Sequence, residues 1–295
     1  MAWRGLHLSQ PSRLSLSDEQ MVVSQTDGET RLALEDIAWV VIDTPQATLT
    51  TALISACMEA GIAIIVTDAR HSPSGVLLPF HRHYRQAGVA AMQVAASLPL
   101  KKRLWQAIIQ AKIKHQAAAL ERCGKDPRAL QAMARLVGSG DPDNTEARAA
   151  REYWGRLFPD FVRENDADRR NVMLNYGYAV VRSALARAAV AVGLLPALGL
   201  HHASVTNAFN LADDLVEPFR PFVDVLVWEM SDRGRRADGE PSVADRRELA
   251  AVLLRNARFG AETVTLLTAS ERTAESLVLA LEGASPALLR LPALE

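Results

Sequence analysis

The chain has 295 residues, of which 49% are hydrophobic and 23% are charged. This length can hold two domains and this composition supports sizeable hydrophobic cores, which excludes an intrinsically disordered chain. No apolar run approaches the roughly 20 residues of a membrane-spanning helix, the first residues lack a basic-then-apolar leader, and the two cysteines lack metal-binding spacing, so we expect a cytoplasmic protein without a membrane partner.

Residues 1–75 are predicted to form a small β-rich N-terminal domain. Apolar and polar residues alternate with the period of a strand in several short segments, and Asp27 and Gly28 mark a hairpin turn. The predicted strands are 6–9, 13–17, 21–24, 31–35, 39–43 and 62–68, with a helix over 48–61. Residues 68–79 break this pattern and predict a hairpin or the start of a linker, which we assign to 76–90.

Charge is distributed unevenly along the chain, although the formal net charge is only −1. Residues 1–75 hold four basic and nine acidic groups, residues 76–125 hold nine and one, and residues 126–295 hold 20 and 24. A basic segment of this kind suits the phosphates of nucleic acid, although a solvated helix surface would look much the same. The candidate DNA-binding residues are Arg82, Arg85, Lys101, Lys102, Arg103, Lys112 and Lys114.

From about residue 88 leucine and alanine dominate, and the alternation typical of strands stops. We therefore predict an α-helical domain over residues 91–295, punctuated by loops near 138–143 and 232–242. The fold class is α+β, with a small β-rich N-terminal domain followed by a larger all-α domain.

Glu146 is the first acidic residue that stands out in the helical part. In a helix it shares one face with Ala150, Tyr153 and Leu157, which favour burial, so its carboxylate needs a partner. The alternative is a glutamate of the first helical turn, favoured by the helix dipole and capped by Asn144 or Thr145.

The segment 198–221 combines two histidines, three acids and an arginine with apolar sequence. Imidazole and carboxylate ligands suit Mg²⁺ or Mn²⁺ better than thiolate-binding metals. Asp214 and Glu217 are three residues apart and share a helical face, while Pro218 and Pro221 predict a kink or restart of the helix. The alternative is that an aspartate caps a helix and the histidines belong to the core.

Together these segments resemble a known family. The motifs are Glu146 followed by Tyr153 and Trp154, then Asn-Tyr-Gly-Tyr at 175–178, Gly-Leu-His-His at 199–202, and Phe-Asn-Leu-Ala-Asp-Asp-Leu-Val-Glu-Pro-Phe-Arg-Pro at 209–221. Their wording and order resemble the CRISPR-associated integrase of the spacer-acquisition module, in the branch from systems with a single RNA-guided effector nuclease.

The resemblance implies a metal site of Glu146, His202 and Glu217, which are also the catalytic residues. His202 is preferred to His201 because both Gly199 and Asp214 place the family histidine there. The resemblance also places three residues beside the ligands, with Asp214 binding the metal through water or orienting the site and Arg220 pairing with an acid. These neighbours are Asp214, Arg220 and His201.

The implied activity is insertion of short DNA fragments into a CRISPR repeat array by attack of a 3′-hydroxyl on a phosphodiester, with Mg²⁺ or Mn²⁺ as cofactor. DNA endonuclease activity uses the same ion. The implied partners are DNA, a second copy bound through the β domain, a small ferredoxin-like adaptor that bridges two dimers, and the effector nuclease. Two alternatives stay open: a stand-alone metal-dependent nuclease for branched or single-stranded DNA, and a non-catalytic DNA-binding scaffold.

Overall fold

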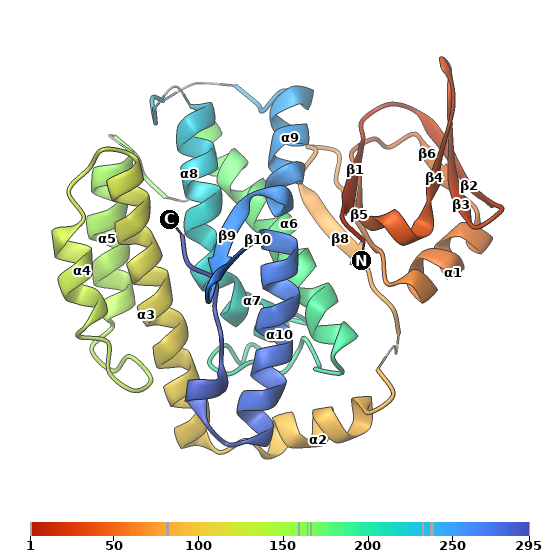
Figure 1. Ribbon diagram of the computed structural model, residues 1–295. Helices are drawn as coiled ribbons and strands as arrows, with labels where there is room; N and C mark the ends of the chain where they lie inside the picture. Colours follow the sequence, from red (N-terminus) through yellow and green to blue (C-terminus); the bar gives the residue numbers. More distant parts are fainter. Residues whose placement is uncertain are drawn as a thin grey trace. The chain divides into compact units, whose positions relative to one another are not determined.

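The computed structural model describes residues 2–80, 83–158, 160–163, 165, 167–231, 233–236 and 239–294. The chain forms two compact units, Met1–Tyr84 and Arg85–Glu295, and each is described by itself. The predicted α+β fold class is confirmed, because a β-rich region precedes a mainly helical one (Figure 1). Within the described residues, no helix combines the length and the apolar character needed to cross a membrane.

The N-terminal unit contains two four-stranded sheets, in the orders β1-β5-β7-β8 and β4-β3-β2-β6. Strands β2, β3 and β4 form an antiparallel meander, whereas β1 and β7 pair in parallel with the fully buried β5. The elements are β1 (Arg4–Leu8), β2 (Ser12–Ser17), β3 (Gln20–Gln25), β4 (Gly28–Ala33), η1 (Leu34–Asp36), β5 (Ile37–Ile42), β6 (Ala47–Leu49), α1 (Thr51–Ala60), β7 (Ala63–Thr67) and β8 (Pro73–Leu77).

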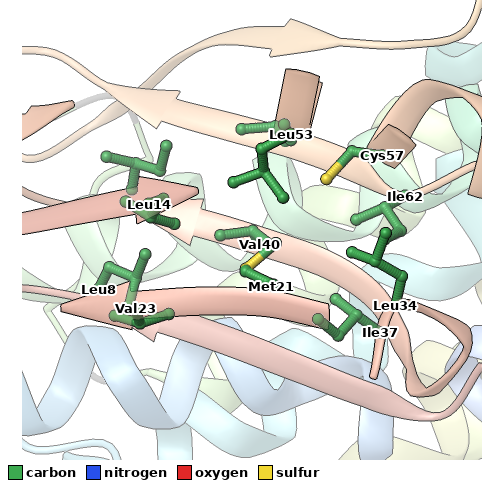
Figure 2. Packing of buried hydrophobic residues seen from close by; sticks show 12 residues of the cluster. Leu8, Leu14, Met21, Val23, Leu34, Ile37, Val40, Leu53, Cys57 and Ile62 are labelled. Carbon is green, nitrogen blue, oxygen red and sulfur yellow. The ribbon is translucent and has the colours of Figure 1, made fainter. Parts of the chain in front are cut away.

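One hydrophobic core holds this unit together. Helix α1 turns Leu53 and Cys57 toward the strands, where they meet side chains such as Leu14 and Val40 (Figure 2). These residues are fully or almost fully buried, as expected for strands whose apolar residues alternate toward one face. The hydrophobic pattern of the first 75 residues therefore determines this unit.

The junction between the units lies within the stretch predicted as a linker. Strand β8 pairs antiparallel with β7 and extends the first unit beyond residue 75. The second unit starts at Arg85, and α2 begins one residue later, at Gln86. A role of the first unit in dimerisation remains a prediction.

The second unit is built around the long helices α3 and α6. Helix α3 packs against α4, α5, η2 and α8, and α6 packs against α7, α8, α9 and α10. The elements are α2 (Gln86–Ala95), α3 (Leu98–Arg122), α4 (Arg128–Ala134), α5 (Thr145–Leu157), α6 (Arg169–Ala191), α7 (Asn210–Val216), η2 (Glu217–Phe219), α8 (Arg220–Met230), α9 (Val243–Ala250), η3 (Ala251–Leu254), β9 (Asn256–Phe259), β10 (Glu262–Thr265), α10 (Leu266–Glu282) and η4 (Pro286–Leu288).

A small hairpin in this unit was not predicted. Strands β9 and β10 pair antiparallel, and Ala293 of the C-terminal tail exchanges two backbone hydrogen bonds with Arg258 of β9. The second unit is therefore mainly helical but not all-α.

Candidate metal centre

Glu146 lies in the first turn of α5, and Asp141 fixes the start of that helix. The Asp141 carboxylate accepts hydrogen bonds from the backbone N–H groups of Thr145 and Glu146, both at 2.9 Å. Asn144 occupies the N-cap position with a φ of 49° but makes no capping side-chain hydrogen bond. Asp141 thus provides the cap expected from Asn144 or Thr145. The Glu146 carboxylate pairs with a different residue, described below.

Glu217 lies at the predicted break between α7 and α8. Helix α7 ends at Val216, a single 3-10 turn follows, and α8 begins at Arg220. Pro218 has no N–H to donate, which explains why the regular helical hydrogen bonding is interrupted here. The Glu217 side chain is 7% exposed, and its Oε1 accepts a hydrogen bond of 2.8 Å from Arg220 Nε.

Lys112 joins the two glutamates. This residue of α3 places its Nζ 2.5 Å from Glu146 Oε1 and 2.5 Å from Glu217 Oε2. The first contact is a hydrogen bond, and the second is an ion pair with the buried Glu217 carboxylate. Two predicted ligands, 71 positions apart in the sequence, therefore meet on one buried cation.

The sequence places Lys112 among the candidate DNA-binding residues. Its side chain is 11% exposed and engaged by two carboxylates, so the structure separates it from the exposed lysines. Ile108 and Gln116, one turn before and one turn after Lys112, are both buried, so its position on α3 belongs to the inward face. The sequence contains little sign of this, because Gln116 is itself polar.

Opposing effects set the pKa values in this cluster. Burial raises the pKa of Glu217, but the positive charges of Arg220 and Lys112 outweigh this effect and hold it at about 2. Burial lowers the pKa of Lys112, and the negative charges of Glu217 and Glu146 more than compensate, so the net shift is upward. Glu217, Lys112 and Arg220 are therefore charged at neutral pH.

His202 is held by a buried carboxylate. Asp214 Oδ1 lies 2.7 Å from His202 Nδ1 and also accepts a hydrogen bond from the backbone N–H of His202 at 3.1 Å. This leaves Nε2 as the ring nitrogen available to a ligand. The Asp214 hydrogen bond raises the pKa of His202, burial opposes this, and the charges of Asp214 and Glu217 raise it further.

The neighbouring residues His201 and Asp213 face other partners. The His201 ring stacks on Trp105 of α3, with centroids 4.2 Å apart and planes within 2°. Trp105 itself is buried. Asp213 pairs with Arg182 at 2.5 Å. The contacts therefore distinguish His202 from His201 and Asp214 from Asp213.

Gly199 allows the histidine loop to approach Asp214 closely. A Cβ at this position would lie 2.2 Å from the backbone oxygen of His202 and 2.8 Å from Asp214 Oδ2. We expect Gly199→Ala to lower the free energy of unfolding by about 1–3 kcal/mol, the usual cost of overpacking, as measured by urea unfolding. Gly155→Ala in α5 is the control, because its Cβ would meet no atom within 4 Å. Equal stabilities of the two variants would contradict this prediction.

Another buried acid, Asp224, lies one turn beyond Arg220 in α8. It accepts hydrogen bonds from Tyr153 of α5, at 2.9 Å, and from Tyr178 of α6. Burial raises the pKa of Asp224 to about 7, although both tyrosine hydrogen bonds and the charge of Arg220 lower it. Tyr153 was predicted to be buried, but nothing in the sequence indicated its partner.

The raised pKa of Asp224 predicts a pH-dependent stability. Because the folded state holds the proton more tightly than the unfolded chain, whose value is near 3.8, this contribution is full below about pH 4 and is lost as the pH rises to about 7. The loss between about pH 5 and pH 8 is roughly 2–3 kcal/mol. Urea unfolding at both pH values should show that the wild type loses this much more unfolding free energy than Asp224→Asn. Equal losses in the two proteins would refute the prediction.

The basic residues occupy different environments. Arg82 lies outside the described residues, and Arg85 is exposed and lies 3.6 Å from Glu282. On α3, Lys102, Arg103 and Lys114 are exposed, and Lys101 is half-buried. Lys101 also lines a cavity of about 450 Å³ with His202. Four basic residues therefore remain accessible or partly accessible on the helix that carries Lys112.

The ligand chemistry fits a divalent ion, although the side chains do not enclose one as they stand. Among the described residues, no three histidine, cysteine or acidic side chains converge closely enough to hold a metal. Two carboxylates and an imidazole are nevertheless suitable donors for Mg²⁺ or Mn²⁺. Glu217 Oε2 is buried and faces the Lys112 ammonium, so a cation already occupies the position toward which this oxygen points. Lys112, Glu217 and Arg220 also line a cavity of about 270 Å³.

Comparisons with known proteins identify the family. The family described as CRISPR associated protein Cas1 matches residues 6–257. A CRISPR-associated endonuclease Cas1 from Neisseria meningitidis serogroup C (strain 8013) is 40% identical over 246 residues, which are 82% of this chain and 81% of that protein.

Two solved structures share the fold. A casposase bound to integration product has a TM-score of 0.78 and 19% identity, over 96% of this chain and 92% of that one. A Cas6-RT-Cas1–Cas2 complex has a TM-score of 0.75 and 17% identity, and the match covers 98% of this chain but only 36% of the other. The predicted relationship to the spacer-acquisition integrases is confirmed: the chain belongs to the Cas1 family of CRISPR-associated proteins.

Proposed function

We propose that this protein is a metal-dependent DNA integrase that inserts short DNA fragments into a CRISPR repeat array. The observation that carries the proposal is the meeting of Glu146 and Glu217 on one buried cation, in the same unit as a histidine held by Asp214. Family membership and the fold shared with a casposase bound to integration product support the same conclusion. Membership of the branch with a single effector nuclease remains part of the proposal.

The proposed reaction is attack of a 3′-hydroxyl on a phosphodiester. Mg²⁺ or Mn²⁺, when bound, supplies Lewis acidity that activates the attacking oxygen and neutralises charge on the phosphate. Glu146, Glu217 and His202 Nε2 would hold the ion. Asp214 fixes the orientation of the imidazole through Nδ1, as carboxylates commonly do for metal-binding histidines. Arg220 fixes the Glu217 carboxylate from the other side.

The proposed partners are DNA, a second copy bound through the β-rich unit, and a small adaptor that bridges two dimers. The name of the Cas6-RT-Cas1–Cas2 complex supports assembly with a further CRISPR-associated protein, and that of the casposase, bound to integration product, supports an integration reaction. The effector nuclease is a further proposed partner.

A second candidate function is DNA cleavage without joining. The name of the Neisseria relative, an endonuclease, favours it. Both functions use the same ion and ligands, and they differ in the nucleophile, which is water for cleavage and a 3′-hydroxyl for joining.

A strand-transfer assay tests the proposal. Purified protein would be incubated with a short duplex carrying free 3′-hydroxyls and a repeat-bearing plasmid, with Mn²⁺ or EDTA and with or without the adaptor. We expect joining that requires both the ion and the 3′-hydroxyl. Cleavage without joining would favour the second candidate, and DNA binding without chemistry would overturn both.

The exposed basic residues of α3 provide a separate test of DNA contact. Replacing Lys101, Lys102 and Arg103 together by glutamine removes three charges near the histidine loop, so we expect DNA affinity to fall by about tenfold or more at low salt. The salt dependence should also become shallower, as measured by fluorescence anisotropy at several salt concentrations, while Mn²⁺ affinity stays constant. An unchanged salt slope would count against a contact between these residues and phosphate.

A further inference from the structure

Lys112 occupies the position between Glu146 and Glu217, where a cation shared by the two carboxylates would bind. Its Nζ lies 2.5 Å from an oxygen of each. Divalent Mg²⁺ binds oxygen ligands at about 2.0–2.1 Å, so it would use the same lone pairs over nearly the same distances. The ammonium and an ion bridging these two oxygens therefore exclude each other.

Charge balance leads to the same conclusion. The cluster of Glu146, Glu217, Lys112 and Arg220 contains two negative and two positive side chains, of which Glu217 and Lys112 are buried and the other two are partly exposed. Adding a divalent ion without moving any group would leave two uncompensated positive charges in a partly desolvated site, which is unfavourable. Arg220 is bound to Glu217 Oε1, whereas among the described residues Lys112 contacts one carboxylate oxygen of each of the two glutamates. Lys112 is therefore the cation that must leave.

We propose that Lys112 is a positioning residue that stands in for the metal, holding the two glutamates together in the ion-free protein and competing with the divalent ion for them. This inference rests on the proposed metal-dependent function. The lysine limits metal affinity and at the same time prevents the two carboxylates from repelling each other. On metal binding the ammonium moves away from the glutamates, and it already lines the cavity of about 270 Å³ beside them.

The test is Mn²⁺ binding measured by isothermal titration calorimetry, without DNA and at one fixed pH. We expect Lys112→Gln to bind Mn²⁺ roughly tenfold more tightly than the wild type or more, within the range of typical coupling between two bound groups. Lys112→Arg keeps the positive charge and should stay close to the wild type. Lys125→Gln is the matched control, because Lys125 is exposed just beyond α3 and makes no ion pair among the described residues.

A second measurement uses the wild-type protein and does not depend on whether a variant folds. Brief acetylation followed by peptide mass spectrometry should label Lys112 slowly in EDTA and several times faster in saturating Mn²⁺, with Lys125 as the internal reference. The displaced ammonium becomes accessible, whereas an ammonium that stays bound to the glutamates remains protected.

The outcomes separate this inference from the proposed function. The proposed function stands if the wild type binds Mn²⁺ and joins DNA. The inference about Lys112 is nevertheless wrong if Lys112→Gln binds Mn²⁺ equally or more weakly and if Lys112 is acetylated at the same rate in EDTA and in Mn²⁺. If the wild type binds no Mn²⁺ at all, both fail. Tighter binding by Lys112→Gln together with metal-dependent labelling supports the competition, whatever the DNA assay shows.

Discussion

Replacing Glu217 by glutamine is expected to reduce metal-dependent joining by on the order of a thousandfold, equivalent to about 4 kcal/mol of transition-state stabilisation. Glutamine keeps the size of the side chain but removes the negative charge that an ion would need. Glu146→Gln and His202→Ala should act in the same direction. The measurement is the initial rate of strand transfer in Mn²⁺, with each protein at saturating DNA.

Loss of activity must be separated from loss of folding, because Glu217 is the partner of two cationic side chains that are largely buried. Removing one partner of a buried ion pair costs roughly 3–5 kcal/mol. Thermal melting in EDTA will show whether Glu217→Gln is folded at the assay temperature. Glu229→Gln makes the same chemical change at a half-exposed ion pair on α8 and should join DNA normally. A folded Glu217→Gln protein that joins DNA within tenfold of the wild-type rate would refute the role of Glu217.

The β-rich unit could be predicted because its strands carry a local signal. Alternating residues such as Leu14 and Leu16 in β2, and the continuous apolar run of β5, specify strands without knowledge of their partners. The hairpin β9–β10 lacks that signal, since each strand has only four residues and lies between helices. Its strand β9 also pairs with the C-terminal tail through Arg258 and Ala293, a contact between distant residues that local sequence does not encode.

The sequence motifs identify the candidate ligands but not the residues outside the motifs that contact or position them. Glu146, His202 and Glu217 could be named as candidates because the motifs around them resemble those of the family, and the break after Val216 follows from two prolines. Lys112 and Asp141 did not stand out. Each is an ordinary polar residue in an ordinary position, and its importance depends on a contact made through tertiary packing.

The same reasoning explains why Asp224 was overlooked. Its raised pKa arises from burial among Tyr153 and Tyr178, which come from two other helices. A single acid on an apolar helix is compatible with several environments until its neighbours are known. Geometry, rather than composition, decides whether such a group is charged.

Asp214→Ala is expected to release the histidine loop from α7. The Asp214 side chain is fully buried and accepts four hydrogen bonds, from the backbone N–H groups of Leu200, His201 and His202 and from the His202 ring, at distances of 2.5–3.1 Å. Alanine leaves these donors without their acceptor, which should lower the free energy of unfolding by about 3 kcal/mol. The imidazole also loses its orienting carboxylate, so Mn²⁺ affinity should fall by roughly ten- to a hundredfold.

The structural and orienting roles of Asp214 can be measured apart. Asp214→Asn keeps the shape of the side chain but removes its charge, so the pKa of His202, which the hydrogen bond to the Asp214 carboxylate raises, should fall in this variant. Proton NMR of the His202 ring as a function of pH measures that change directly. Asp213→Asn is the matched control, because Asp213 pairs with Arg182 instead of the histidine and its substitution should move the His202 pKa much less. An unchanged His202 pKa in Asp214→Asn would mean that the carboxylate anchors the loop but does not control protonation of the imidazole. The loss of metal affinity in Asp214→Ala would then have to arise from displacement of the backbone alone.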